Sequence, residues 1–139
     1  MTSAAFEQRN PYKGSPERPW IRVRLRAADG SDHELELLAD TGSPFAIILG
    51  EALFLGLKHR DISGASSGFG AMTGGWLQVV TPELGVDTDL VGYGSDDILT
   101  TVQASSTDFL GLAGLPLLRL MEYGGDADAF WVRSVAAKP

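Results

Sequence analysis

Residues 20–43 read WIRVRLRAADGSDHELELLADTGS. Apolar and charged residues alternate in 21–26 and again in 33–37, which is the two-residue period of a half-buried strand. The glycine-containing turn between these segments joins them as a hairpin. The second strand ends on Asp40, which a hydroxyl, a glycine and another hydroxyl follow directly. The sequence therefore predicts a carboxylate at the end of a buried strand, surrounded by hydrogen-bond donors.

The charged faces of the two strands predict how they pair. The predicted register places these residues opposite each other: Leu25 and Leu35, Arg26 and Glu34, and Arg24 and Glu36. Each pair of opposite charges on the solvent side contributes about 0.2–1 kcal/mol. This register requires a loop with an odd number of residues. We predict the three-residue loop 29–31, with Gly30 at a positive φ.

The composition limits the class of protein. The chain has 139 residues, of which 44% are hydrophobic and 21% are charged, so we expect one soluble globular domain. Its net charge of −7 argues against nucleic-acid binding. It has no cysteine, and its 2 histidines form no metal-binding pattern, so we expect no metal and no cofactor. Because it lacks a long apolar run and an apolar N-terminal signal segment, we expect no membrane association and a cytoplasmic location.

The remaining segments predict an all-β domain. Residues 1–19, with little apolar periodicity, are expected to form an N-terminal arm that precedes a domain over 20–139. Glycine is so frequent in 61–76 that this segment suits a mobile hairpin or loop. Further strands are predicted at 45–49, 76–86, 97–103 and 129–135, and helices at 50–57 and 115–123. Many short strands with one or two short helices are typical of a closed β-barrel or sandwich.

The residues after the second strand have two chemical interpretations. A carboxylate that works as an acid or base needs a fixed orientation. The backbone N–H of Gly42 and the hydroxyl of Ser43 are placed to supply it by hydrogen bonding to Asp40. Asp-Thr-Gly-Ser is also good turn chemistry, in which aspartate and serine bond their own backbone. The residues alone are consistent with a catalytic site and with a structural turn.

The stretch LLADTGS at 37–43, followed by FAIIL at 45–49, resembles the active-site loop and following strand of aspartic proteases. That family needs two such aspartates, whereas VDTDL at 86–90 has an aspartate in place of the motif's glycine. The resemblance is therefore to the retropepsin-like (retroviral-type) branch, in which each chain of a homodimer supplies one aspartate. A glycine-rich flap at 61–76 fits the family's order. So does LAGLPLL at 112–118, which is expected beneath the active-site loop and leading into a helix.

The resemblance implies an aspartic endopeptidase that hydrolyses peptide bonds in a peptide or protein substrate. Asp40 of each chain would act as general acid or base, and the pair would activate a water. Thr41 would hydrogen-bond across the dimer, and Gly42 would let backbone approach the carboxylate and the substrate. Ser43 would orient the outer oxygen of Asp40. The flap residues expected to face the substrate are Phe69, Met72 and Trp76.

Two positions depart from the retroviral pattern. Pro44 stands where an aspartate is usual, and Leu115 stands where that aspartate's arginine partner is usual. Because both members of the ion pair are replaced by apolar residues, we expect the loop to keep its fold while the mode of peptide binding changes. Proline also lacks the backbone N–H that would bind substrate. The alternative function is a non-catalytic retropepsin-like module that dimerises or binds peptides, with Asp40 kept for loop structure.

Overall fold

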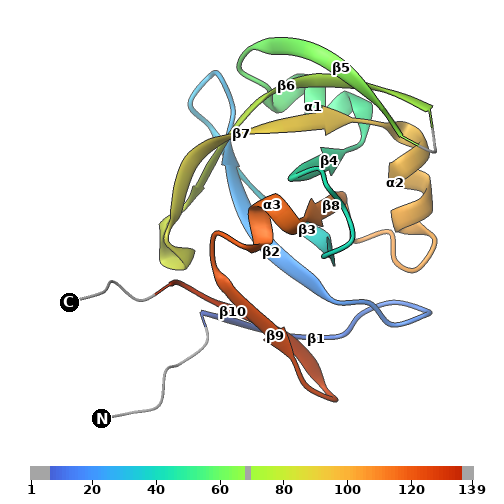
Figure 1. Ribbon diagram of the computed structural model, residues 1–139, viewed down its shortest axis with the longest axis vertical. Coiled ribbons are helices and arrows are strands. Elements are labelled where there is room, and N and C mark those ends of the chain that lie inside the picture. The colour runs from blue at the N-terminus through green and yellow to red at the C-terminus, as the bar shows by residue number, and fades with distance from the viewer. Residues whose placement is uncertain (1–6, 68–69, 136–139) are drawn as a thin grey trace.

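The structure, a computed structural model, describes residues 7–67 and 70–135. Within them six strands close into a barrel in the hydrogen-bonded order β2-β3-β8-β4-β7-β6, because β6 pairs back onto β2 (Figure 1). The barrel strands are β2 (Trp20–Arg26), β3 (Asp32–Asp40), β4 (Ile47–Leu49), β6 (Gly70–Thr81), β7 (Val86–Gly94) and β8 (Gly111–Gly114). The predicted all-β class with a closed barrel is confirmed.

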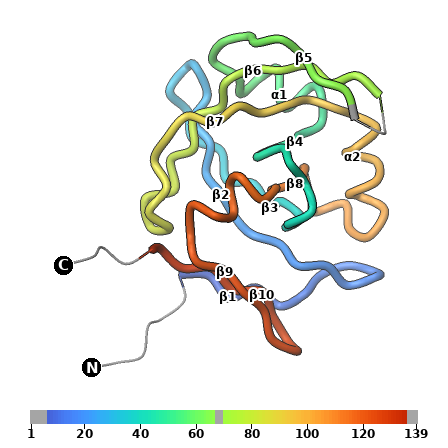
Figure 2. Tube along the Cα trace, in the orientation of Figure 1, coloured from blue at the N-terminus to red at the C-terminus, as the bar shows by residue number. Residues whose placement is uncertain are grey.

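The other elements lie around this barrel. Strand β5 (Asp61–Ser67) pairs with β6 as a hairpin, in the glycine-rich segment where the sequence predicts one. A separate sheet, lying below the barrel in Figure 2, consists of β1 (Gln8–Pro11), β10 (Ala129–Arg133) and β9 (Glu122–Gly125). The helices are α1 (Glu51–Leu57), the 3-10 turn η1 (Pro82–Leu84), α2 (Asp96–Gln103) and α3 (Leu115–Leu118). None of these described helices is long and apolar enough to cross a membrane.

The β2–β3 hairpin forms as predicted, but its register differs from the prediction by two residues. The observed opposite pairs are Val23 and Leu35, Arg24 and Glu34, and Arg22 and Glu36. The cause is the position of the loop. Ala27 N donates to Ser31 O at 2.8 Å, so the three-residue loop is 28–30, one residue earlier than predicted. Gly30 has the expected positive φ, at 89°. Opposite charges still share the outer face.

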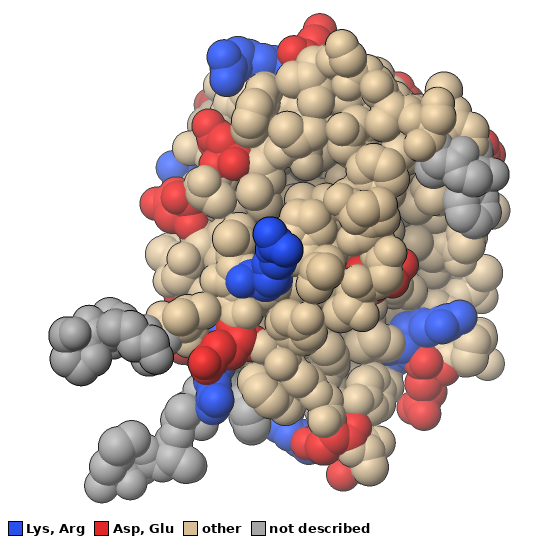
Figure 3. All heavy atoms as spheres, viewed as in Figure 1, with Lys and Arg blue, Asp and Glu red and all other residues tan. Residues whose placement is uncertain are grey.

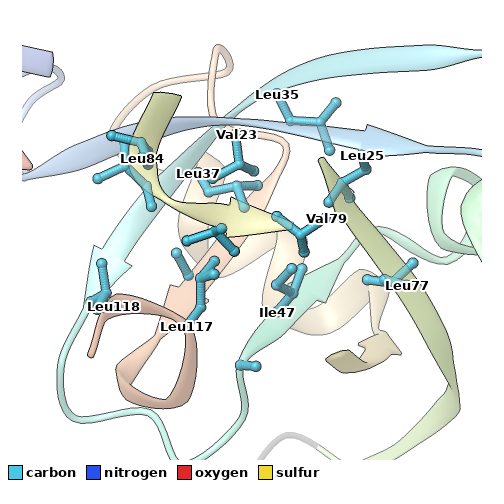
Figure 4. Close-up of a cluster of buried hydrophobic side chains, with 14 of the residues drawn as sticks. Val23, Leu25, Leu35, Leu37, Ile47, Leu77, Val79, Leu84, Leu117 and Leu118 are labelled. Atoms are coloured by element: carbon cyan, nitrogen blue, oxygen red, sulfur yellow. The ribbon is translucent and has the colours of Figure 1, made fainter. Parts of the chain in front are cut away.

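Apolar side chains from distant parts of the chain fill the barrel. The residues labelled in Figure 4 converge from β2, β3, β4, β6, η1 and α3, and all are buried. They are Val23, Leu25, Leu35, Leu37, Ile47, Leu77, Val79, Leu84, Leu117 and Leu118. Removal of this surface from water is the main favourable term in folding. Because the core spans both ends of the chain, β3 and its terminal Asp40 are held in a rigid frame.

The prediction of a strand at 97–103 is wrong, since these residues form helix α2. The Ser95 hydroxyl accepts a hydrogen bond from Ile98 N at 3.2 Å and caps the helix. Ile98 and Val102, four residues apart, turn to the same buried side. Asp96, in the first turn of this helix, accepts a hydrogen bond from Glu51 N at 2.9 Å. The cap and this helical spacing outweigh the strand preference of the β-branched residues.

The predicted helix 115–123 is correct only in its first turn. Helix α3 ends at Leu118, and the tighter bond from Met121 N to Leu118 O turns the chain out of the helix. Met121 enters the core, and the following residues pair with β10 as strand β9. Burial of Met121 and the β9–β10 hydrogen bonds replace the rest of the expected helix. The sequence also predicts no helix between α1 and α3. In the structure α2 lies between them.

The N-terminal segment predicted as an arm lies against the domain from β1 onward. Strand β1 pairs with β10, and the side chain of Asn10 donates to Trp20 O at 3.0 Å. Lys13 and Arg18 then form an antiparallel bridge that closes a turn. Ser15 N donates to Ser105 O, and Ala39 N donates to Pro19 O, both at 2.9 Å. These bonds bring the turn beside the end of β3.

Candidate active site

Asp40 lies at the point where three strands of the barrel meet. It is the last residue of β3 and pairs in parallel register with Gly114 of β8. Strand β8 also pairs with β4 in the antiparallel sense, so β8 lies between the strands before and after the 41–46 loop. Helix α3 follows Gly114 directly. The segment 112–118 therefore runs beside the loop and leads into a helix, as expected from the sequence.

Gly114 makes the loop geometry possible. A Cβ built on Gly114 would overlap the carbonyl oxygen of Phe45 and would lie 2.8 Å from the Ser43 hydroxyl. Its N–H donates to Ala46 O at 2.9 Å, and the next N–H, of Leu115, donates to Ser43 O at 3.1 Å. The loop thus packs directly against the backbone of β8, which fixes its position and orientation.

The Asp40 carboxylate is half-buried and bonded to its own loop. Its Oδ1 accepts a hydrogen bond from Gly42 N at 2.9 Å. A Cβ at position 42 would lie 3.2 Å from that oxygen, which is closer than an ordinary contact. Gly42 therefore allows the backbone to approach the carboxylate, as predicted. The bond fixes one oxygen of the carboxylate relative to the loop.

The predicted role of Ser43 is not the one in the structure. The Ser43 side chain is buried, and its hydroxyl donates to Phe45 O at 3.0 Å and accepts from Phe45 N at 3.1 Å. Both bonds close a local turn, so within the described residues the hydroxyl bonds to Phe45 and not to Asp40. The Ser43 N–H also donates to the Asp40 carbonyl at 3.1 Å, so the backbone and the side chain of Ser43 close the same turn. The loop uses serine in its turn-forming role.

Thr41 and Gly42 are exposed at the tip of the loop, and so is Pro44. A hydrogen bond from Thr41 across a dimer stays a prediction, because the structure is that of one chain. The segment that joins β3 to β4 crosses the face seen in Figure 1. In Figure 3 most of this face is uncharged, but one basic group lies near its middle and an acidic group lies to the right of it.

The three predicted flap residues have different locations. Phe69 lies outside the described residues. Met72 is buried in an apolar cluster with Ile98, Val102 and other side chains. Trp76 is half-buried, with the Arg60 guanidinium 5.8 Å from its ring centre. Neither Met72 nor Trp76 lines the cavity beside Asp40 that is described next.

A cavity of about 380 Å³ opens beside Asp40, within the size range of ligand pockets. Its walls come from the end of β3, the start of β8, helix α2 and the 16–19 turn. The apolar residues among them include Pro16, Pro19, Leu38, Ile98, Val102 and Leu112. Among the described residues of the lining, Arg18 is the one basic residue and Asp40 is the one acidic residue. The carboxylate thus lies in the wall of an otherwise largely apolar cleft.

Sequence reasoning missed much of this cavity. It placed the 16–19 turn in an arm outside the domain and interpreted α2 as a strand. A signal for α2 was present, because Ser95 before Asp96 and Asp97 is an N-terminal cap pattern. No comparable signal predicted the turn, whose position depends on its bond to Ser105, ninety positions away in the chain.

The site offers no group of ligands for a metal. In residues 7–67 and 70–135 no three His, Asp or Glu side chains are arranged to hold a metal ion. The chemistry that the residues themselves can perform is therefore that of a carboxylate. It is held at the mouth of an apolar cleft, with one oxygen fixed by a backbone N–H.

Comparisons with protein-family models, with curated proteins and with solved structures find no match to this chain. The resemblance to retropepsins therefore rests on the sequence of the loop and its order along the chain.

Proposed function

We propose that this protein is an aspartic endopeptidase that acts as a homodimer with one Asp40 from each chain. The observation that carries the proposal is the Asp40 loop. Its carboxylate accepts a hydrogen bond from Gly42 N at the end of a buried strand, over Gly114, and faces a cleft. A carboxylate in a turn with only a structural role does not need the cleft.

The proposed mechanism follows from bringing two such carboxylates together. Two adjacent carboxylates cannot both ionise easily, so the pair shares one proton. The ionised member removes a proton from a water, which attacks the carbonyl carbon of the scissile bond. The protonated member donates a hydrogen bond to the carbonyl oxygen, and the pair then delivers a proton to the leaving nitrogen. The Gly42 N–H keeps one oxygen of each carboxylate oriented during these steps.

The dimer and the flap complete the proposed enzyme. Thr41 and Gly42, exposed at the loop tip, are the residues that meet the partner chain at a two-fold axis. The β5–β6 hairpin serves as the flap, which closes over the substrate and excludes water. Its register is irregular between Ile62 and Ala65, and Gly64 packs against the backbone of Met72. The proposed bending point is the irregular register between Ile62 and Ala65.

A second candidate is a non-catalytic dimeric module that binds peptides. One observation favours it: the Ser43 hydroxyl serves the turn and leaves Asp40 with the Gly42 N–H as its hydrogen-bond partner in the described chain. Pro44 also lacks the N–H that would bind a substrate backbone. On this account the cleft binds peptide, and Asp40 only shapes the loop.

A peptide library separates the two functions. The protein is incubated with diverse peptides from acidic to neutral pH, and the products are read by mass spectrometry beside the Asp40→Asn variant. We expect cuts with the wild type that disappear in the variant. The matched control is Asp87→Asn, an exposed acid in the other Asp-Thr pair of the chain, which should leave cleavage unchanged. A folded dimer that cuts no peptide would contradict the protease and favour the binding module. An Asp40→Asn variant that still cuts would contradict the catalytic role of Asp40.

A further inference from the structure

Arg18 differs from the other basic residues of the described chain. It is exposed on the turn that forms one wall of the cavity, and that turn is fixed by backbone bonds to Lys13 and Ser105 and from Ala39 to Pro19. Its position relative to Asp40 therefore follows from the fold and not from a free loop. Among the described residues that line the cavity, Arg18 is the only basic one.

The charge on Arg18 is not compensated within the described chain. Lys13, on the same turn, binds both Glu36 and Asp108, and its hydrogen bond to Glu36 raises its pKa. Most other cations also have an acidic or aromatic partner: Arg9, Arg22, Arg24, Arg26, Lys58, Arg60 and Arg133. Among the described basic residues only Arg18 and Arg119 have no such partner, and only Arg18 lines the cavity.

We propose that Arg18 determines substrate choice, so that the enzyme prefers peptides carrying an acidic side chain near the bulky apolar residue that fills the cavity. This inference rests on the proposed peptidase function and deepens it. The apolar side chain packs against α2 and the end of β3, where Ile98, Val102 and Leu38 line the cleft. The acidic side chain pairs with the guanidinium at the rim. Arginine suits this role because its planar group binds a carboxylate through two hydrogen bonds.

The size of the preference follows from the exposure of Arg18. An exposed ion pair is weak and is screened by salt. We therefore expect about a two- to fivefold preference for glutamate over glutamine at one peptide position, which falls as salt is added. The same contact is made in the ground state and the transition state, so the preference should appear in KM with kcat nearly unchanged.

The test uses paired peptides of the form X-X-Phe-Leu-X-X, with glutamate or glutamine fixed at each X in turn. Cleavage rates are compared for the wild type, Arg18→Gln and Arg18→Glu. The matched control is Arg119→Gln, an exposed arginine without an acidic partner that lies outside the cavity. We expect Arg18→Gln to abolish the glutamate preference, Arg18→Glu to reverse it, and Arg119→Gln to keep it.

Peptide binding separates failure of this inference from failure of the proposed function. The same labelled peptides are titrated by fluorescence anisotropy into Asp40→Asn protein, with and without Arg18→Glu. If peptides are cut but glutamate is not preferred, or the preference survives Arg18→Glu, the role of Arg18 is refuted and the peptidase stands. If nothing is cut but glutamate peptides bind preferentially through Arg18, the peptidase is refuted and the selectivity of the cavity stands. Absence of both cleavage and binding contradicts both proposals.

Discussion

Gly114 is the residue on which the shape of the Asp40 loop depends most directly. Any side chain there would displace the Phe45 carbonyl and the Ser43 hydroxyl, both of which belong to the loop. We predict that Gly114→Ala lowers the free energy of unfolding by about 1–3 kcal/mol, the usual cost of overpacking. Urea denaturation at one fixed chain concentration measures the change, because the stability of a dimer depends on concentration.

Gly56 provides the control for this substitution. It lies within α1, and a Cβ on it would meet nothing within 4 Å. Gly56→Ala should leave stability unchanged or raise it by up to about 1 kcal/mol, because alanine is the better helix former. Equal losses in the two variants would contradict the account of Gly114 as the support of the loop.

At the scale of elements, helix α2 depends on its N-terminal cap. The buried Ser95 hydroxyl accepts from Ile98 N, and the helix in turn forms a wall of the cavity. We predict that Ser95→Ala lowers the free energy of unfolding by about 1 kcal/mol. The exposed Thr100 in the same helix is the control, since Thr100→Ala should change stability by less than about 0.5 kcal/mol. No difference between these variants would contradict the cap.

The β9–β10 hairpin predicts a dependence of stability on pH. Hydrogen bonds to Asp126 from the backbone of Asp128 and Ala129, and the nearby Arg9, hold the pKa of its carboxyl below its ordinary value. A carboxyl with a lowered pKa in the folded state stabilises the protein above its ordinary pKa, near 4. That contribution is lost as the pH falls through the folded value.

The Asp126→Asn variant isolates this contribution. At neutral pH the wild type should be more stable than the variant in urea denaturation. The difference should shrink as the pH falls below about 4, since asparagine has no charge to lose. A difference that is the same at pH 7 and pH 3, or that grows on acidification, would contradict the assignment.

The elements also show what the sequence allows one to predict. Three features follow from local patterns. They are the β2–β3 hairpin, the closed all-β fold, and the order along the chain of Asp40, the glycine-rich hairpin and Gly114. The register of that hairpin does not, because residues 27–31 allow the loop to lie at either of two adjacent positions. The β-branched residues of 97–103 favour a strand by propensity, and only the cap and the spacing of Ile98 and Val102 identify the helix.

The candidate site was predictable only where it is local. The Asp40–Gly42 contact spans two residues and follows from the motif. The predicted role of Ser43 was wrong because its backbone N–H and its hydroxyl both close the local turn. The cavity could not be predicted, since it requires the 16–19 turn, α2 and β3 to meet through bonds such as Ser15 N to Ser105 O.

At the scale of the whole molecule, the closed barrel leaves Asp40 at its surface beside one cleft. The β2–β6 pairing closes the barrel and the core fills it, so the single chain is a rigid frame for one carboxylate. The proposed chemistry needs two carboxylates, and the chain has one Asp-Thr-Gly motif. The proposed active unit therefore contains two chains and one shared site.

Mixing of chains tests this claim most directly. Equal amounts of wild type and Asp40→Asn are unfolded together and refolded, and peptide cleavage is measured at constant total chain concentration. If both aspartates are required, only dimers of two wild-type chains are active. Random pairing then leaves about one quarter of the wild-type rate. A rate of about one half would mean that each chain acts alone, and would contradict the shared site.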